Sequence, residues 1–126
     1  MHDVLSSGEE QEQTYEGERN AAGEYEGHGT MRWADGDAYD GDFKNGNFDG
    51  KGKRTYADGT VYDGQWRNDM RDGKGTCQYV DMARIGVSGT YSGMWKRNLK
   101  DGRGSFDFEN GDKFEGMWKG DVRCGR

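Results

Sequence analysis

The sequence predicts an all-β protein, built as an elongated, single-layer antiparallel sheet of stacked β-hairpins. Three observations lead to this prediction. The chain of 126 residues repeats itself about every 23 residues, and a fixed period of roughly 20–50 residues indicates stacked supersecondary units. Within each copy the side chains alternate with the period of a half-buried strand. Asp-Gly or Asn-Gly pairs separate the alternating segments, and they favour hairpin turns because glycine adopts the positive φ that such turns need.

Each copy opens on the pattern aromatic-x-Gly-x-aromatic, and in the second, third and fourth copies a Gly-x-Gly follows eleven residues after the start. The first copy departs from this pattern, because Arg19 stands where the other copies have Trp or Phe. We expect residues 15–126 to form the array, with the last repeat incomplete and lacking a returning strand. Residues 1–14 are expected to form an acidic, flexible N-terminal tail. The copies start at Tyr15, Tyr39, Tyr62, Tyr91 and Phe114.

The turn between two strands decides which side chains share a face. A three-residue loop over residues 57–59 pairs Tyr56 with Thr60 and places Tyr56 on the same face as Tyr62. A two-residue turn over Asp58-Gly59 would put the two tyrosines on opposite faces. One buried face specifies the register strongly, so we favour the three-residue loop.

The composition fits a folded protein with a thin, mostly aromatic core. Apolar residues make up 30% of the chain and charged residues 33%, a balance that by itself suggests disorder. The 13% of aromatic residues and the strict spacing argue against disorder, and the absence of proline suits uninterrupted strands. In the favoured register Gly52 and Gly64 face each other and leave a slot that a neighbouring aromatic ring can fill.

The net charge of −6 is concentrated at the start of the chain. Residues 1–27 contain eight acids against Arg19 alone, which gives −7, so the remaining residues sum to +1. Nucleic-acid binding needs clustered Lys and Arg, and we therefore expect no nucleic-acid partner. The N-terminus lacks the basic start and apolar stretch of a signal peptide, and no apolar run is long enough to span a membrane. We expect a protein of the cytoplasm or cytoskeleton.

The Tyr-x-Gly-x-Trp pattern, followed by Gly-x-Gly and Asx-Gly at this period, resembles the MORN repeat family over residues 15–125. This resemblance implies a twisted single-layer sheet of stacked hairpins. The opening segment, residues 15–29, is also similar to the opening repeat of radial spoke head protein 1 homologues, through the Arg-Asn-x-x-Gly insertion at residues 19–23. The second similarity implies a place in the axoneme of a cilium or flagellum.

The expected function is that of a non-catalytic scaffold or adaptor with a protein-binding surface and a protein partner of unknown identity. The first alternative, implied by the family's use at membranes, is a membrane-associated module that binds acidic phospholipids. Its residues would be Lys96, Arg97, Lys100 and Arg103, although the near-neutral array predicts weak or no binding to anionic vesicles. The second alternative is a regulatory MORN segment of a larger enzyme such as a phosphatidylinositol phosphate kinase.

The sequence predicts no enzymatic activity, no cofactor and no metal site. His28 is expected to be a solvated turn residue within its Gly-x-Gly. Cys77 has inward parity and is expected to fill a small space in the core. It shares no repeat offset with Cys124, so no disulfide framework is implied. Residues 35–42 hint at a calcium loop, but the positions that an EF-hand needs for its ligands carry unsuitable residues.

An aromatic stripe is the first candidate for protein binding. A single layer cannot cover both of its faces, and a contiguous exposed apolar patch marks an interaction surface. The alternative is that the rings only pack the ribbon against itself. Trp33, Phe106 and Phe108 belong to the stripe. Its candidate binding residues are Tyr39, Phe43, Tyr56, Tyr62, Trp66, Tyr79, Tyr91, Trp95, Phe114 and Trp118.

An inserted loop is the second candidate. The step from Tyr79 to Tyr91 is six residues longer than the matching step from Tyr56 to Tyr62. Loops on rigid scaffolds often carry function, while neutral length drift is the alternative. A short Ala-Asp-Gly type of turn in place of residues 81–87 is expected to preserve folding and to weaken partner capture. The candidate interaction loop residues are Val80, Met82, Ile85 and Val87.

The last repeat also suggests self-association. Without a returning strand, the array would end on an open sheet edge, and such edges pair readily with another chain. We therefore expect a homodimer through the C-terminal repeat. Exchanging Trp118 for Ser should then yield a monomer with intact central hairpins.

Overall fold

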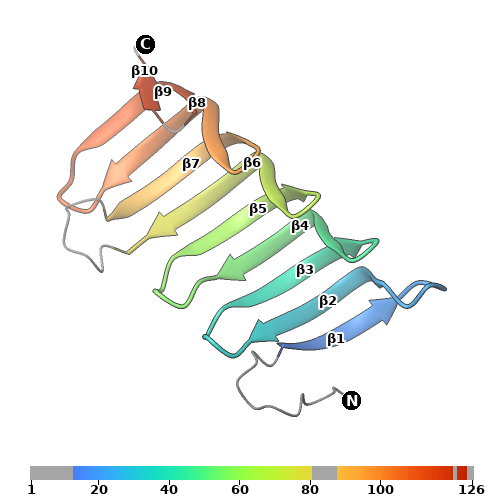
Figure 1. Ribbon diagram of the computed structural model, residues 1–126. Coiled ribbons are helices and arrows are strands. Elements are labelled where there is room, and N and C mark those ends of the chain that lie inside the picture. Colours follow the sequence, from blue (N-terminus) through green and yellow to red (C-terminus); the bar gives the residue numbers. More distant parts are fainter. Residues whose placement is uncertain (1–12, 81–87, 121, 125–126) are drawn as a thin grey trace.

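The computed structural model describes residues 13–80, 88–120 and 122–124. These residues form one antiparallel sheet of ten strands, whose order in space follows the order in the chain (Figure 1). The predicted all-β, elongated single-layer array of hairpins is therefore confirmed. The strands are β1 (Gln13–Arg19), β2 (Tyr25–Trp33), β3 (Ala38–Lys44), β4 (Asn47–Thr55), β5 (Val61–Arg67), β6 (Met70–Tyr79), β7 (Gly89–Lys96), β8 (Leu99–Phe108), β9 (Lys113–Lys119) and β10 (Val122–Cys124).

Along one side of the sheet, the turns after β2, β4 and β8 are three-residue loops. The backbone N–H of Tyr56 donates to the carbonyl oxygen of Thr60 at 2.8 Å, and the N–H of Gly59 donates to the carbonyl of Tyr56 at 2.9 Å. The register predicted for this turn is therefore confirmed. The same pair of bonds recurs in the turns that follow Trp33 and Phe108.

Along the other side, the turns after β3, β5 and β7 have two central residues, both with positive φ. They are Asn45-Gly46 with φ of 51° and 87°, Asn68-Asp69 with 49° and 71°, and Arg97-Asn98 with 49° and 74°. Two residues of positive φ define the type I′ turn, whose twist matches that of the flanking strands. Only the first of these pairs is the Asn-Gly dipeptide that predicts such a turn from sequence.

A row of glycines crosses the sheet from β1 to β9, each glycine paired with a glycine on the next strand. The row leaves the space into which tyrosine rings fit. A Cβ atom at Gly52 would overlap the ring of Tyr39, so the predicted slot exists and Tyr39 fills it. The row consists of Gly17, Gly29, Gly41, Gly52, Gly64, Gly75, Gly93, Gly104 and Gly116.

Each Gly-x-Gly lies inside a strand, not in a turn. In the central copies its first glycine has positive φ, as at Gly50 with 107°, next to a register shift between Gly41 and Phe43. A β-bulge of this kind bends the strand locally, and Figure 1 shows the strands curving toward the ends that carry the two-residue turns. The expected turn position of His28 is therefore wrong, because His28 lies within β2.

The C-terminal copy differs from the expectation of a missing second strand. Val122 pairs with Lys119, Arg123 with Trp118 and Cys124 with Met117, so a short returning strand follows β9. The homodimer through this repeat stays a prediction. Nothing helical in the described part of the chain has the length and apolar character needed to span a bilayer.

Candidate functional site

The aromatic stripe lies on one face of the sheet, here called the inner face, and most of it is buried. Tyr39, Tyr62 and Tyr91 are 0% exposed. Each of these rings lies over a glycine of its own strand and one of the next strand, and its hydroxyl donates to a carbonyl three residues on, as from Tyr39 to Asp42 at 2.8 Å. Burial raises the pKa of Tyr39 and of Tyr62 well above that of free tyrosine.

The remaining rings close over the tyrosines. Trp66 meets the edge of Tyr62 at 5.0 Å between ring centroids, and its indole N–H donates to the carbonyl of Gly52 at 3.0 Å. Trp95 and Trp118 repeat this indole bond one and two copies further on. The rings thus cover one another, and the sheet does not need a second layer to bury them.

The expectation of an exposed stripe is consequently wrong for most of its residues. The buried candidates, at 6% exposure or less, are Tyr39, Phe43, Tyr62, Trp66, Tyr91, Trp95 and Trp118. Tyr56, Tyr79 and Phe114 are partly buried and pack against them, as do Trp33 and Phe108. Their role in binding stays a prediction.

A groove of about 430 Å³ opens on the N-terminal half of the inner face. Trp33 and Phe48 meet edge to face at 6.1 Å, and Phe48 stacks on Tyr39 at 3.9 Å. The groove thus combines aromatic walls with a few polar groups, a composition typical of a binding site. It is lined by Gln13, Tyr25, Met31, Trp33, Gly46, Phe48, Arg54 and Asp69.

One inner-face position changes its chemistry along the array. Tyr25 stacks on Tyr15 at 3.9 Å, and Phe48 stacks in the same way on Tyr39. In the next two copies, the equivalent residues are Arg71 and Lys100. The guanidinium of Arg71 lies 4.7 Å from the ring of Trp95, and the ammonium of Lys100 lies 5.0 Å from that of Tyr79. The inner face thus changes from aromatic to cationic toward its C-terminal half.

Arg54 is a further cation on this face. Its guanidinium lies 4.6 Å from the ring of Trp33 and 4.9 Å from that of Tyr56, and its Nη2 atom lies 2.7 Å from an Asp37 carboxylate oxygen. The carboxylate of Asp37 therefore forms an ion pair with Arg54. Among the described residues, no three His, Cys, Asp or Glu side chains gather as a metal site.

The outer face carries a different set of side chains in its C-terminal half. Met94 pairs with Lys74 and Met117 pairs with Arg103, so cations and methionines alternate over the four strands from β6 to β9. The two methionines are 41% and 40% exposed, and Leu99 near the adjoining turn is 41% exposed. This outer patch is defined by Lys74, Met94, Lys96, Leu99, Arg103 and Met117.

The basic cluster predicted for lipid binding is split between the two faces. Lys100 pairs with Trp95 on the inner face, whereas Lys96 and Leu99 pair with each other on the outer face. The bulge beside Gly102 shifts the register at this point, yet Lys100 keeps the parity of Gly104 and Phe106 and therefore lies on the inner face opposite Trp95.

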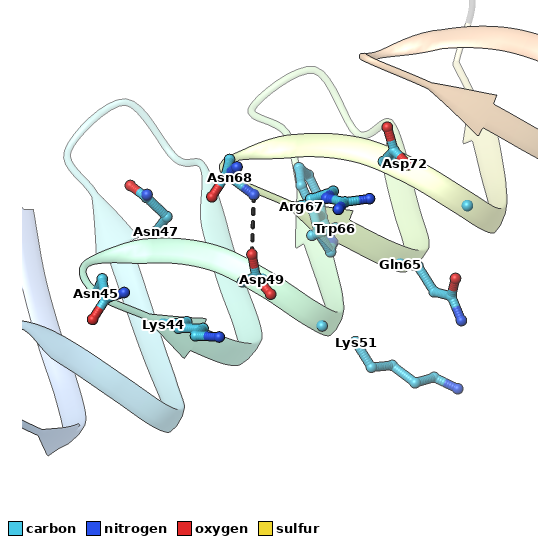
Figure 2. A pocket seen from close by; sticks show the side chains of 12 residues that line it. Lys44, Asn45, Asn47, Asp49, Lys51, Gln65, Trp66, Arg67, Asn68 and Asp72 are labelled. Carbon is cyan, nitrogen blue, oxygen red and sulfur yellow. Dashed lines mark hydrogen bonds between the residues drawn. The ribbon is translucent and has the colours of Figure 1, made fainter.

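Successive hairpins interlock at their two-residue turns. The N–H of Asn68 donates to an Asp49 carboxylate oxygen at 3.2 Å, a contact drawn in Figure 2. In return, the carboxylate of Asp69 accepts the N–H of Phe48 at 2.8 Å. Arg97 donates to Asp72 in the same way, one copy further on. These bonds tie each copy to the next.

Hollows between neighbouring turns are polar and of mixed charge. The one in Figure 2, of about 720 Å³, has Lys44, Lys51 and Arg67 on its wall together with Asp49 and Asp72. Because both carboxylates already accept backbone N–H groups, this hollow is a product of the interlocked turns. Its lining is mostly polar, with Trp66 as its aromatic residue, whereas the inner-face groove has several aromatic residues in its lining.

The other predicted residues have structural surroundings. Cys77 is fully buried, which confirms its place in the core, and burial raises the pKa of its thiol. The exposed side chain of His28 lies 2.9 Å from Asp40. Val80 is 41% exposed, while Met82, Ile85 and Val87 lie outside the described residues. The part played by Met31, Phe48 and Arg71 was not foreseen, because these residues lie outside the aromatic-x-Gly-x-aromatic pattern.

A family model places the chain among known proteins. The MORN repeat model matches residues 21–38, 39–61, 62–81, 91–113 and 114–126. These segments make up more than half of the sequence, and the chain therefore belongs to the MORN repeat family. MORN repeats are in general modules that bind proteins or membranes. No curated protein gives a significant match to the chain.

Proposed function

We propose that the protein is a non-catalytic scaffold or adaptor whose inner face binds a protein partner. The observation that carries the proposal is the open groove beside Trp33 and Phe48, set into an otherwise packed aromatic face. Tyrosine and tryptophan dominate the binding energy of many protein interfaces. A partner side chain that enters the groove would complete a core that the sheet leaves open at this end.

The interlocked turns support a scaffolding role. Each copy contacts its neighbours through backbone and side-chain bonds as well as through rings. Arrays of this kind gain their stability from nearest-neighbour contacts and present extended binding surfaces. The similarity of residues 15–29 to radial spoke head protein 1 homologues supports a place in a ciliary or flagellar axoneme as the finer form of this proposal.

Site-specific crosslinking tests the proposal. A photo-crosslinking amino acid replaces Trp33, which lines the groove, and in a matched variant replaces Asp63, which is exposed on the outer face. After illumination in native extract, the products are identified by mass spectrometry. We expect a specific crosslinked protein from position 33 and none from position 63. The same products from both positions, or products from position 63 alone, would contradict the proposal.

The outer patch favours a membrane as the second candidate function. Exposed methionines beside cations suit a surface that meets acidic lipid headgroups, since polybasic segments are attracted to anionic membranes. Co-sedimentation with phosphatidylserine vesicles tests this candidate. If it holds, Arg103→Gln with Lys96→Gln abolishes binding, whereas Lys100→Gln does not, because Lys100 lies on the inner face. Absence of vesicle binding at physiological salt would leave the first candidate alone.

A further inference from the structure

We infer that the partner segment that docks on the inner face is an acidic peptide with interspersed apolar side chains. This inference rests on the proposed function and adds the chemistry of the occupant. It follows from the distribution of charge between the two faces of the sheet.

The inner face presents cations in successive copies of the repeat. The guanidinium of Arg19 lies 5.0 Å from the ring of Tyr25, and that of Arg54 lies 4.6 Å from the ring of Trp33. In the C-terminal half, the ammonium of Lys100 lies 5.5 Å from the ring of Trp118. Contacts of this kind hold a cation against an aromatic surface. A contact with an aromatic ring does not neutralise the charge of the cation.

Carboxylates are nearly absent from the same face. The cross-strand pairs that contain the rings and the glycine row show which residues of β1–β9 lie on the inner face. Each of these residues is an aromatic residue, a glycine, a cation or a neutral residue such as Met31 or Cys77. Among the described residues, three carboxylates border this face, and one of them, Asp112, holds the position of Asp37 in the last copy and accepts the side-chain N–H of Asn110. Asp37 pairs with Arg54, and Asp69 accepts the N–H of Phe48.

The contrast with the whole chain makes this distribution informative. The protein has a net charge of −6, yet its acids point to the outer face, as Asp40, Asp63 and Glu115 do, or lie in turns and the N-terminal segment. Complementary charge guides partner choice at interfaces. An acidic segment is therefore favoured on the inner face and disfavoured on the outer face of the N-terminal half.

The distance between Arg71 and Lys100 determines whether a single peptide can contact both cations. They hold equivalent positions on β6 and β8, two strands apart, which corresponds to roughly 10 Å in a sheet. Arg71 is partly buried and donates to the side-chain and carbonyl oxygens of Asn98, which are neutral acceptors. This spacing suits two carboxylates of a single segment, while its apolar side chains contact partly buried rings such as Tyr79 and Phe108.

Peptide selection on the full-length chain tests the inference. A phage library of random twelve-residue peptides is selected on the chain that carries the photo-crosslinker at position 33, and crosslinked peptides are sequenced. The tightest of them are synthesised, and their binding is measured by fluorescence anisotropy. The inner variant is Arg71→Gln with Lys100→Gln. The matched outer variant, which removes the same number of charges, is Lys74→Gln with Arg103→Gln.

We expect the crosslinked peptides to be enriched in Asp and Glu above the input library. Their affinity should fall at least tenfold on the inner variant and change less than twofold on the outer variant. Where Arg71→Gln lowers the melting temperature, Lys100→Gln alone and the charge-retaining Arg71→Lys keep the comparison decisive. Loss of affinity with Lys100→Gln and retention with Arg71→Lys would support the inference.

Two outcomes separate this inference from the proposed function. Crosslinked peptides without enrichment in acids, or with equal loss on both variants, would overturn the inference and leave a protein-binding inner face in place. A failure of any peptide to crosslink at position 33 would overturn both. Selected peptides that are lysine-rich would also overturn the inference.

Discussion

Replacement of Gly75 by alanine tests how the inner face is packed. Gly75 pairs with Gly64 on one side and Gly93 on the other, and a Cβ atom on it would overlap the ring of Tyr62. That ring is 0% exposed, and its hydroxyl donates to the carbonyl of Gln65 at 2.9 Å. The added methyl group therefore forces the ring out of its place.

The expected cost follows from the contacts that the ring loses. Removal of a large aromatic side chain from a core costs about 3–5 kcal/mol, and displacement of the Tyr62 ring forfeits a good part of this. Loss of the hydroxyl bond adds about 1 kcal/mol. Alanine recovers about 0.5–1 kcal/mol because it is less flexible than glycine in the unfolded chain. The net expectation is destabilisation by about 3 kcal/mol.

Gly111→Ala is the matched control. A Cβ atom at Gly111 meets nothing within 4 Å, but its φ of 102° disfavours alanine. This variant therefore carries a backbone cost of about 1–2 kcal/mol and no clash. Urea unfolding followed by tryptophan fluorescence measures both variants. With a slope of about 2 kcal/mol per molar urea, the midpoint should fall by about 1.5 M for Gly75→Ala. A shift no larger than that of Gly111→Ala would refute the reasoning.

Three further predictions concern the other elements of the core. Burial raises the pKa of Tyr39 and Tyr62 above the ordinary 10.0. Their contribution to stability is therefore present below about pH 10 and is lost as the pH rises further, because the tyrosines of the unfolded chain ionise first. A urea midpoint that is constant from pH 9 to about pH 11 would contradict this prediction. Asn98→Ala removes the side-chain oxygen that accepts the backbone N–H of Arg71 at 2.9 Å, and it should cost about 2 kcal/mol with faster amide exchange in β6 and β8. Asn110→Ala removes a side-chain oxygen that accepts the N–H of Asp112 within its own turn, and it should cost less than half as much and leave exchange in those strands unchanged. Trp66→Phe deletes the indole bond to Gly52 and should cost about 1–2 kcal/mol in thermal unfolding, while an unchanged midpoint would show that the bond is not a net stabiliser.

The fold was predictable because local signals and the repeat agree. The Ala57-Asp58-Gly59 turn fixes its own register once Tyr56 and Tyr62 must share a face, and the structure has that register. The glycine slot follows from the same register, since Gly52 then faces Gly64. Turns without glycine were harder to recognise. Arg97-Asn98 adopts the same two-residue turn as Asn45-Gly46 although its sequence does not indicate it.

The inner face was predicted only in part. The stripe itself is visible in the spacing, but its burial depends on rings that lie over glycines of the neighbouring strand, which spacing along one strand does not show. The inner-face cations Arg71 and Lys100 were not predicted from the sequence for a different reason. Phe48, Arg71 and Lys100 occupy equivalent places, and residues of such different chemistry do not form a recognisable motif.

Methyl NMR of the methionines tests most directly which face binds a partner. Met31 lines the inner-face groove and is 5% exposed, while Met94 and Met117 mark the outer patch. The full chain, labelled at its methionine methyl groups, is titrated with the partner captured at position 33. The account predicts that the Met31 resonance shifts while those of Met94 and Met117 stay in place. Shifts confined to Met94 and Met117 would contradict it and would place binding on the outer face.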